Sequence, residues 1–119
     1  MLTTADLLKK ECQHQENALS DAEIAHLLTQ VDGWALADGT IARSFAFQNY
    51  YETLAFINAI AYVIHAEDHH PELIVTYNRC TVKFNTHSVK NAQGGQGGIS
   101  ENDFICAAKV DAIFAQSFS

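Results

Sequence analysis

The chain has 119 residues, of which 48% are hydrophobic, and a formal net charge of −7 at pH 7. A chain of this length forms one domain and buries roughly two-thirds of its unfolded surface, so we expect a single packed domain over residues 1–119. The acidic balance and the scattered basic residues exclude a nucleic-acid partner, because phosphate binding requires clustered Lys and Arg.

The cysteines and the N-terminus indicate the compartment. Cys12, Cys80 and Cys106 are odd in number and lack the spacing of a disulfide framework, so free thiols in a reducing environment are expected. The N-terminus has no signal-peptide core, and no apolar run reaches transmembrane length. The sequence therefore predicts a cytoplasmic protein that has no membrane partner.

The first half of the chain predicts a helix and a β-hairpin. Residues 1–18 are polar and weakly patterned, which fits a short helix or a loose N-terminal arm. Ser20 and Glu23 form a capping box that opens a helix. Asp38-Gly39 is a hairpin turn signal between strands expected at 34–38 and 41–47. Four residues of the second strand share one face, and its aromatic residues are expected in the core: Ile41, Arg43, Phe45 and Phe47.

Asn49 and Glu52 are predicted to cap the next helix, whose apolar residues recur at helical spacing. The predicted stripe consists of Tyr50, Leu54, Ile57, Ala61 and Ile64, widened by Phe56, Ile60 and Val63. An apolar face this broad predicts packing on the sheet and also on a second surface, such as another subunit.

Two more strands are predicted near residues 73–77 and 80–86, joined by Asn78-Arg79, followed by a glycine-rich loop over 88–99. Ser100 then caps a last helix. The predicted fold is therefore α+β: a four-stranded antiparallel sheet with helices packed on one face, in the order α-β-β-α-β-β-α.

Three histidines carry the candidate chemistry. His69 and His70 follow a long helical pattern and precede Pro71, the only proline, so the backbone leaves the helix and both rings can turn toward one pocket. His87 follows sixteen residues after Pro71. Because the imidazole pKa ordinarily lies near neutrality, this set indicates acid–base chemistry or a metal. The other histidines are expected at the surface or at helix ends: His14, His26 and His65.

These motifs allow two other interpretations, a zinc site and a phosphate-binding loop. His65 and His69 have the i, i+4 spacing of a zinc chelate, with Glu67, Asp68 and His87 as further ligands, but neither His-Glu-x-x-His nor paired cysteines occur. The glycine-rich loop before Ser100 could cradle a phosphate, yet it lacks the full dinucleotide or P-loop pattern. A flexible insertion is the favoured interpretation of that loop, and a metal-free site that of the histidines.

The ordered elements Asp68-His69-His70-Pro71-Glu72, Tyr77-Asn78, Thr86-His87 and Ser100-Glu-Asn-Asp103 resemble the pterin-4a-carbinolamine dehydratase family. Gly33-Trp34 and the segment 41–47 add to this resemblance, which runs from about Ser20 to the C-terminus. The resemblance implies the same element order and the dehydration of 4a-hydroxytetrahydropterin to quinonoid dihydropterin, which recycles the cofactor of aromatic amino-acid hydroxylases.

The resemblance also implies the site and the assembly. The catalytic residues would be His69, His70 and His87, and the pterin would contact Asp68, His69, His70, Asn85, Thr86 and His87. No metal or other cofactor is implied, and the chain would form a homodimer or homotetramer. Two departures are His65, where some members have glutamate, and a longer loop before Asp103. Asp103 itself fits either a helix-dipole residue or a partner of a histidine. The rival interpretation is a non-catalytic pterin-binding or protein-interaction module on the same fold.

Overall fold

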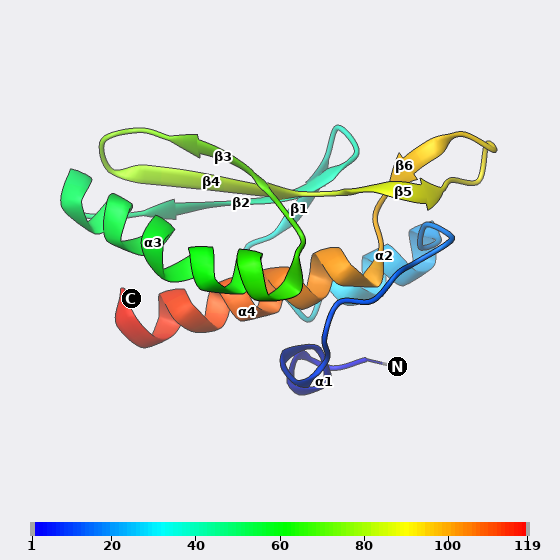
Figure 1. The fold of residues 1–119 in the computed structure, drawn as a ribbon, viewed down its shortest axis with the longest axis horizontal. Helices are drawn as coiled ribbons and strands as arrows, with labels where there is room; N and C mark the ends of the chain where they lie inside the picture. The colour runs from blue at the N-terminus through cyan, green and yellow to red at the C-terminus, as the bar shows by residue number, and fades with distance from the viewer. Residues whose placement is uncertain (1, 119) are drawn as a thin grey trace.

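In the computed structural model, which describes residues 2–118, a four-stranded antiparallel sheet lies over a layer of helices (Figure 1). Its strands are β1 (Ala35–Ala37), β2 (Thr40–Ala46), β3 (Glu72–Val75) and β4 (Arg79–Phe84), in the spatial order β1-β2-β4-β3. On one face of this sheet lie α2 (Asp21–Leu28), α3 (Tyr50–Glu67) and α4 (Glu101–Ser117), and α1 (Thr4–Lys9) packs beyond α4. The predicted α+β class is confirmed. Among residues 2–118, no helix has the length and apolarity needed to cross a bilayer.

The helix caps and the first hairpin turn lie at the residues predicted from the sequence. Ser20 and Glu23 form the capping box of α2, and the Asn49 side chain accepts from the Glu52 amide at the start of α3. Asp38 and Gly39 both have left-handed backbone conformations, with φ of 53° and 77°. That pair of conformations makes the tight two-residue turn whose twist matches a hairpin, so β1 and β2 pair directly.

The central strands β2 and β4 place their alternate residues as predicted. Ile41 lies opposite Phe84, and Phe45 lies opposite Cys80, all buried on the helix-facing side. The charged member of this face is Arg43, whose guanidinium lies 4.4 Å above the Phe45 ring and donates to Asp111 in α4 at 2.8 Å. This pairing lets a cation occupy a core-facing position.

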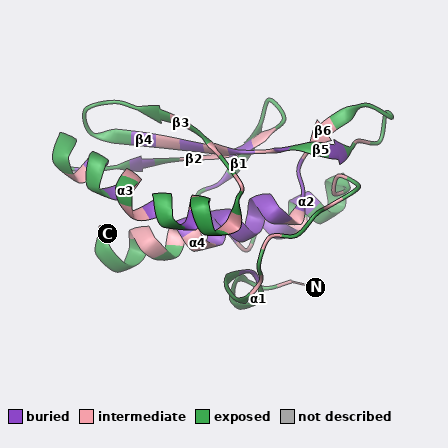
Figure 2. Ribbon diagram, viewed as in Figure 1, coloured by how far each residue is buried: buried purple, intermediate pink, exposed green. Residues whose placement is uncertain are grey.

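Helix α3 meets the core through the residues that widen the predicted stripe rather than through the stripe itself. The buried residues of α3 are Thr53, Phe56, Ile60 and Val63, whereas Tyr50, Leu54, Ile57, Ala61 and Ile64 are half-buried or exposed, with Leu54 at 37%. Because both faces of this helix are apolar, periodicity alone could not decide which of them meets the sheet. Figure 2 shows exposed ribbon along much of α3, in contrast to the continuously buried centre of α4.

The first strand of the second hairpin ends earlier than predicted. Strand β3 stops at Val75, and the turn runs over residues 76–78 before β4 begins at Arg79. Thr76 N–H donates to the Arg79 carbonyl at 2.9 Å, which closes the turn. The buried Thr53 hydroxyl of α3 donates to the Tyr77 carbonyl at 3.0 Å and ties the turn to the helix layer. The bond between Thr53 and Tyr77 joins residues 24 positions apart, so it has no signature in the local sequence.

The glycine-rich segment 88–99 is not the unstructured loop that was predicted. It forms most of a third hairpin, made of β5 (Thr86–Lys90) and β6 (Gln96–Gly98). The Asn91 side chain organises the turn, because its Oδ1 accepts from the Gly95 amide at 3.0 Å and its Nδ2 donates to the Gly97 carbonyl at 3.3 Å. An asparagine that bonds nearby backbone groups supplies the turn that the glycines alone did not indicate.

Candidate functional site

Three segments that are distant in sequence meet around the His69 side chain. They are the C-terminal end of α3, the junction of β4 and β5, and the first turn of α4. Helix α3 ends at Asp68, which adopts the left-handed conformation with φ 50° and ψ 43°. Aspartate tolerates that conformation better than most residues, and it turns the chain out of the helix just before His69.

His69 is fixed on two sides. Its Nε2 lies 2.5 Å from Oδ1 of Asp103 in the first turn of α4, and its ring stacks on Phe84 with centroids 5.8 Å apart and planes 7° apart. The His69 side chain is 13% exposed and that of Asp103 is fully buried. An ionised carboxylate only accepts, so the imidazole proton lies on Nε2 and leaves Nδ1 as the free ring nitrogen.

The second oxygen of Asp103 is also fully engaged. Oδ2 accepts from the Thr86 hydroxyl at 2.9 Å and from the Ser100 amide at 2.9 Å. Since the Thr86 proton is used in this bond, the Ser100 hydroxyl donates to Thr86 Oγ1 at 2.7 Å. The His69 ring, the Thr86 hydroxyl and the Ser100 amide thus compensate the buried charge, so Asp103 both caps α4 and partners a histidine. Sequence reasoning left these two roles as alternatives.

The predicted site residues border one hollow. A cavity of about 290 Å³ is lined by Asp68, His69, His70, Asn85, Thr86, His87 and Ser88. His70 and His87 are exposed, and the carboxylate of Asp68 lies 3.7 Å from His70 Nε2. The three rings therefore share one cavity, in which His69 is held rigidly while His70 and His87 face solvent.

Sequence reasoning considered Glu67 only as a metal ligand, and the structure gives it other partners. Its carboxylate accepts from the Cys12 amide at 2.7 Å and from Lys109 Nζ at 2.7 Å. Burial acts to raise the pKa of Glu67, but these two donors outweigh it and hold the pKa below its ordinary value. No local pattern indicated this contact, because its members are separated by 55 and 42 residues.

The residues of the proposed zinc chelate do not converge. His65 is exposed on the last turn of α3, whereas His69 turns to Asp103. Within residues 2–118, no three His, Cys, Asp or Glu side chains come together in a way that could hold a metal ion. The other two histidines lie where expected, His14 at the surface and His26 in the last turn of α2.

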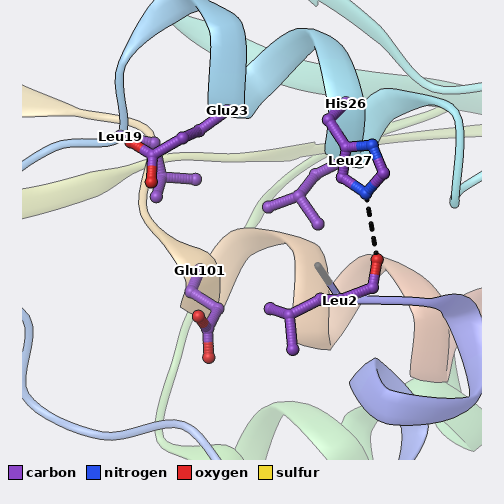
Figure 3. A pocket seen from close by; sticks show the side chains of 6 residues that line it. All are labelled: Leu2, Leu19, Glu23, His26, Leu27 and Glu101. Atoms are coloured by element: carbon purple, nitrogen blue, oxygen red, sulfur yellow. Dashed lines mark hydrogen bonds between the residues drawn. The ribbon is translucent and has the colours of Figure 1, made fainter.

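A separate hollow of about 230 Å³ lies between α2 and the start of α4 (Figure 3). Its floor is formed by Leu2, Leu19 and Leu27, and His26 Nε2 donates to the Leu2 carbonyl at 3.2 Å. Its two carboxylates are already engaged, Glu23 by the Ser20 amide and Glu101 by Lys10. This hollow shares no lining residue with the histidine cavity.

Comparison with known proteins identifies the family. The model of the family described as Pterin 4 alpha carbinolamine dehydratase matches residues 17–113. A Bdellovibrio bacteriovorus protein named "Putative pterin-4-alpha-carbinolamine dehydratase" is 56% identical over 119 residues, covering 100% of this chain and 97% of its own length. A Nitrosospira multiformis protein of the same name is 49% identical over 115 residues, which cover 94% of this chain and 96% of that protein.

A solved structure extends the likeness to the fold. The crystal structure of a transcriptional coactivator/pterin dehydratase from Brucella melitensis has a TM-score of 0.71 and 34% identity, over 82% of this chain and 98% of that one. The resemblance found in the histidine motifs is thus confirmed over nearly the whole chain. The chain belongs to the pterin-4a-carbinolamine dehydratase family, a family of hydro-lyases that act in pterin metabolism.

Proposed function

We propose that this protein dehydrates 4a-hydroxytetrahydropterin to quinonoid dihydropterin by histidine acid–base catalysis, and that it thereby recycles the cofactor of aromatic amino-acid hydroxylases. One observation carries the proposal. Three imidazoles from two distant segments line one cavity of about 290 Å³, and one of them is bonded to a fully buried carboxylate. Family membership supports the reaction class.

The reaction requires two proton transfers. The C4a–O bond breaks, and the hydroxyl must leave as water because hydroxide is a poor leaving group. The N5–H proton is lost, and the N5 electron pair forms the C4a=N5 double bond. One acid near the C4a hydroxyl and one base near N5–H therefore suffice. Each well-placed proton transfer contributes about 10²–10⁴-fold to the rate.

The hydrogen bonds of the rings support a division of roles. His69 carries its proton toward Asp103, so its free nitrogen is suited to accept the N5 proton while Asp103 compensates the charge that develops on the ring. Among the described residues, His70 and His87 have no such partner within hydrogen-bond distance, and they are suited to protonate the leaving hydroxyl. In this proposal the backbone of Asn85 and Thr86 and the side chain of Asp68 hold the flat pterin edge.

The proposal extends to the assembly and the compartment. On α3, Tyr51 is 80% exposed and Tyr62 is 77% exposed, and Leu54 lies on the same helix. Apolar rings in such positions support a homodimer or homotetramer that covers this helix. The free thiols Cys12, Cys80 and Cys106 support a cytoplasmic location.

The test is a coupled assay with phenylalanine hydroxylase and a tetrahydropterin, in which the absorbance of the 4a-carbinolamine is followed with and without this protein. Faster decay that a chelator does not change is the expected result, and it would also remove the zinc reading. Unaltered decay in the presence of folded protein that still binds dihydropterin would reject the dehydratase and favour the binding module.

A further inference from the structure

We propose that Cys12 and Cys106 form a peroxide-reactive thiol pair, in which Cys12 is oxidised first and Cys106 then closes a disulfide to it. The product is a covalent link between the N-terminal segment, residues 10–15, and helix α4. The inference goes beyond the proposed function, because the dehydration uses neither thiol.

The two sulfur atoms are already neighbours. Cys12 Sγ lies 3.6 Å from Cys106 Sγ, although 94 positions separate the two residues in the chain. A disulfide has a sulfur–sulfur distance of about 2.05 Å, so the sulfurs must approach by about 1.5 Å. Residues 10–15 belong to no helix or strand, whereas Cys106 lies in the buried centre of α4. Cys12 is therefore the member of the pair that moves.

Backbone hydrogen bonds hold the N-terminal segment beside α4. Asn102 of α4 pairs with both backbone groups of Gln13: the Gln13 amide donates to Oδ1 at 3.1 Å and Nδ2 donates to the Gln13 carbonyl at 2.7 Å. Glu67 accepts from the Cys12 amide at 2.7 Å. These bonds keep the two thiols together before any oxidant arrives, so closing the disulfide needs no search by the chain.

The two thiols differ in access, which assigns their order of reaction. Cys12 is partly exposed and borders two hollows, one of about 400 Å³ beside His69 and one of about 370 Å³ beside Tyr62 and Lys109. Cys106 has no exposed surface. An oxidant from solvent therefore meets Cys12, and Cys106 reacts only with a neighbour that is already oxidised.

The hydrogen bonds favour the same order. The Cys12 thiol donates to the Asn102 carbonyl at 3.7 Å, so the bond between the two sulfurs has Cys106 as its donor. This donor stabilises a thiolate on Cys12, and the same contact, together with burial, raises the pKa of Cys106. The nearby carboxylate of Glu67 is paired with Lys109 Nζ at 2.7 Å, which reduces its repulsion of a thiolate.

The oxidation consumes one peroxide. The Cys12 thiolate attacks a peroxide oxygen: an S–O bond forms, the O–O bond breaks, and the departing oxygen takes a proton and leaves as water. Cys106 then loses its proton and attacks the Cys12 sulfur, so that the S–S bond forms, the S–O bond breaks and the hydroxyl leaves with that proton as water. The two sulfurs together lose two electrons, which the peroxide gains, and a dithiol reverses the link.

The surroundings favour a small, neutral oxidant. Glu11 and Glu67 line the hollow of about 370 Å³, and Glu67 precedes Asp68 at the edge of the other, so an anionic oxidant such as glutathione disulfide is repelled. A hydroperoxide carries no charge. Within residues 2–118 no third His, Cys, Asp or Glu completes a metal site with the two thiols. Redox chemistry is thus the use that this pair supports.

The experiment treats the full reduced chain with hydrogen peroxide, alkylates the remaining thiols with iodoacetamide in urea and digests the protein with trypsin. Cleavage after Lys and Arg places each cysteine in its own peptide, 11–43, 80–83 or 91–109. We expect peptide 11–43 linked to peptide 91–109, with the free thiols falling from three to one per chain and returning to three after dithiothreitol.

Two variants separate the steps. Cys80→Ala is the matched control, because it removes the other buried thiol and should leave the link unchanged. Cys106→Ser, which keeps nearly the same volume in the core, should leave Cys12 as a sulfenic acid that dimedone captures. Far-UV circular dichroism checks that both variants are folded.

Four results would overturn the proposal. They are oxidised Cys12 with peptide 91–109 unlinked in the native protein, loss of the link in folded Cys80→Ala, a link between two copies of peptide 11–43, and a glutathione adduct at Cys12 that forms faster than the peroxide product.

Discussion

His69 and Asp103 are 34 residues apart in the chain, yet their side chains lie 2.5 Å apart where the end of α3 meets the start of α4. Asp103 has no exposed surface, and all its partners come from the site: the His69 ring, the Thr86 hydroxyl and the Ser100 amide. The carboxylate thus links the orientation of a candidate catalytic ring to the capping of α4.

Asp103→Asn should lower kcat about 100-fold while KM changes less than threefold. An amide presents an NH₂ group either to His69 or to Thr86 and Ser100, so one of these donors loses its acceptor, and the proton of His69 is no longer held on Nε2. The measurement is the pH–rate profile with far-UV circular dichroism as the folding control. A profile of native shape, merely scaled down, would show that Asp103 acts only on stability.

His87→Ala should lower turnover about 10²–10⁴-fold with little effect on folding, because the ring is exposed and bonds to no described partner. His65→Ala is the matched control, since His65 is also exposed but lies outside the cavity.

His69→Ala should likewise lower turnover, but it also leaves Asp103 Oδ1 without a partner and should cost about 1–3 kcal/mol of stability. Native turnover in both His69→Ala and His87→Ala would reject the acid–base assignment.

Glu67→Gln should destabilise the protein in a pH-dependent way. The folded-state pKa of Glu67 lies below its ordinary value of 4.5, so the contribution of its ionised form is present in full above that pH and is lost as pH falls through the folded-state pKa. Urea unfolding should show a loss of about 1.5–3 kcal/mol at pH 7 that shrinks below pH 4.5. Glu16→Gln serves as the exposed control, and a loss of equal size at pH 7 and pH 3 would contradict the role of the charge.

Cys12 should react with iodoacetamide before the other two thiols. Burial raises the pKa of Cys80 to about 11, so its thiolate fraction at pH 8 is about 10⁻³. The hydrogen bond with Cys12 and burial raise the pKa of Cys106 as well. Cys12 is partly exposed and borders the hollow beside His69. Peptide mass mapping of briefly labelled protein should find Cys12 modified alone, and all three modified in urea. Equal labelling in the native state would refute the burial of Cys80 and Cys106.

Ile60→Ala should cost about 2–5 kcal/mol, and Leu54→Ala about 0.5 kcal/mol, although both are aliphatic residues of α3. The difference between the two losses of stability shows which face of α3 packs on the sheet. Unfolding in urea at low micromolar concentration measures both values. Equal costs for the two variants, with a midpoint that rises with protein concentration, would show that Leu54 is covered by another copy of the chain.

The features that depend on neighbours along the chain could be predicted from the sequence. Two helices begin at capping pairs three residues apart, Ser20 with Glu23 and Asn49 with Glu52. The first hairpin turns at the adjacent residues Asp38 and Gly39, whose backbone preferences suit a tight turn. The adjacent His69 and His70 before Pro71, together with Thr86-His87, Ser100–Asp103 and the other ordered motifs, indicated the family, and the predicted site residues line one cavity.

The choice between equivalent partners depends on how the helices and the sheet pack together in three dimensions. Both faces of α3 are apolar, and packing on the sheet chose Ile60 over Leu54. Asp103 could cap a helix or hold a histidine, and the approach of α3 to α4 made it do both. The attachment of the N-terminal segment to Asn102 joins groups 89 residues apart. Such contacts are fixed by burial and hydrogen bonding across the whole core, which no local pattern records.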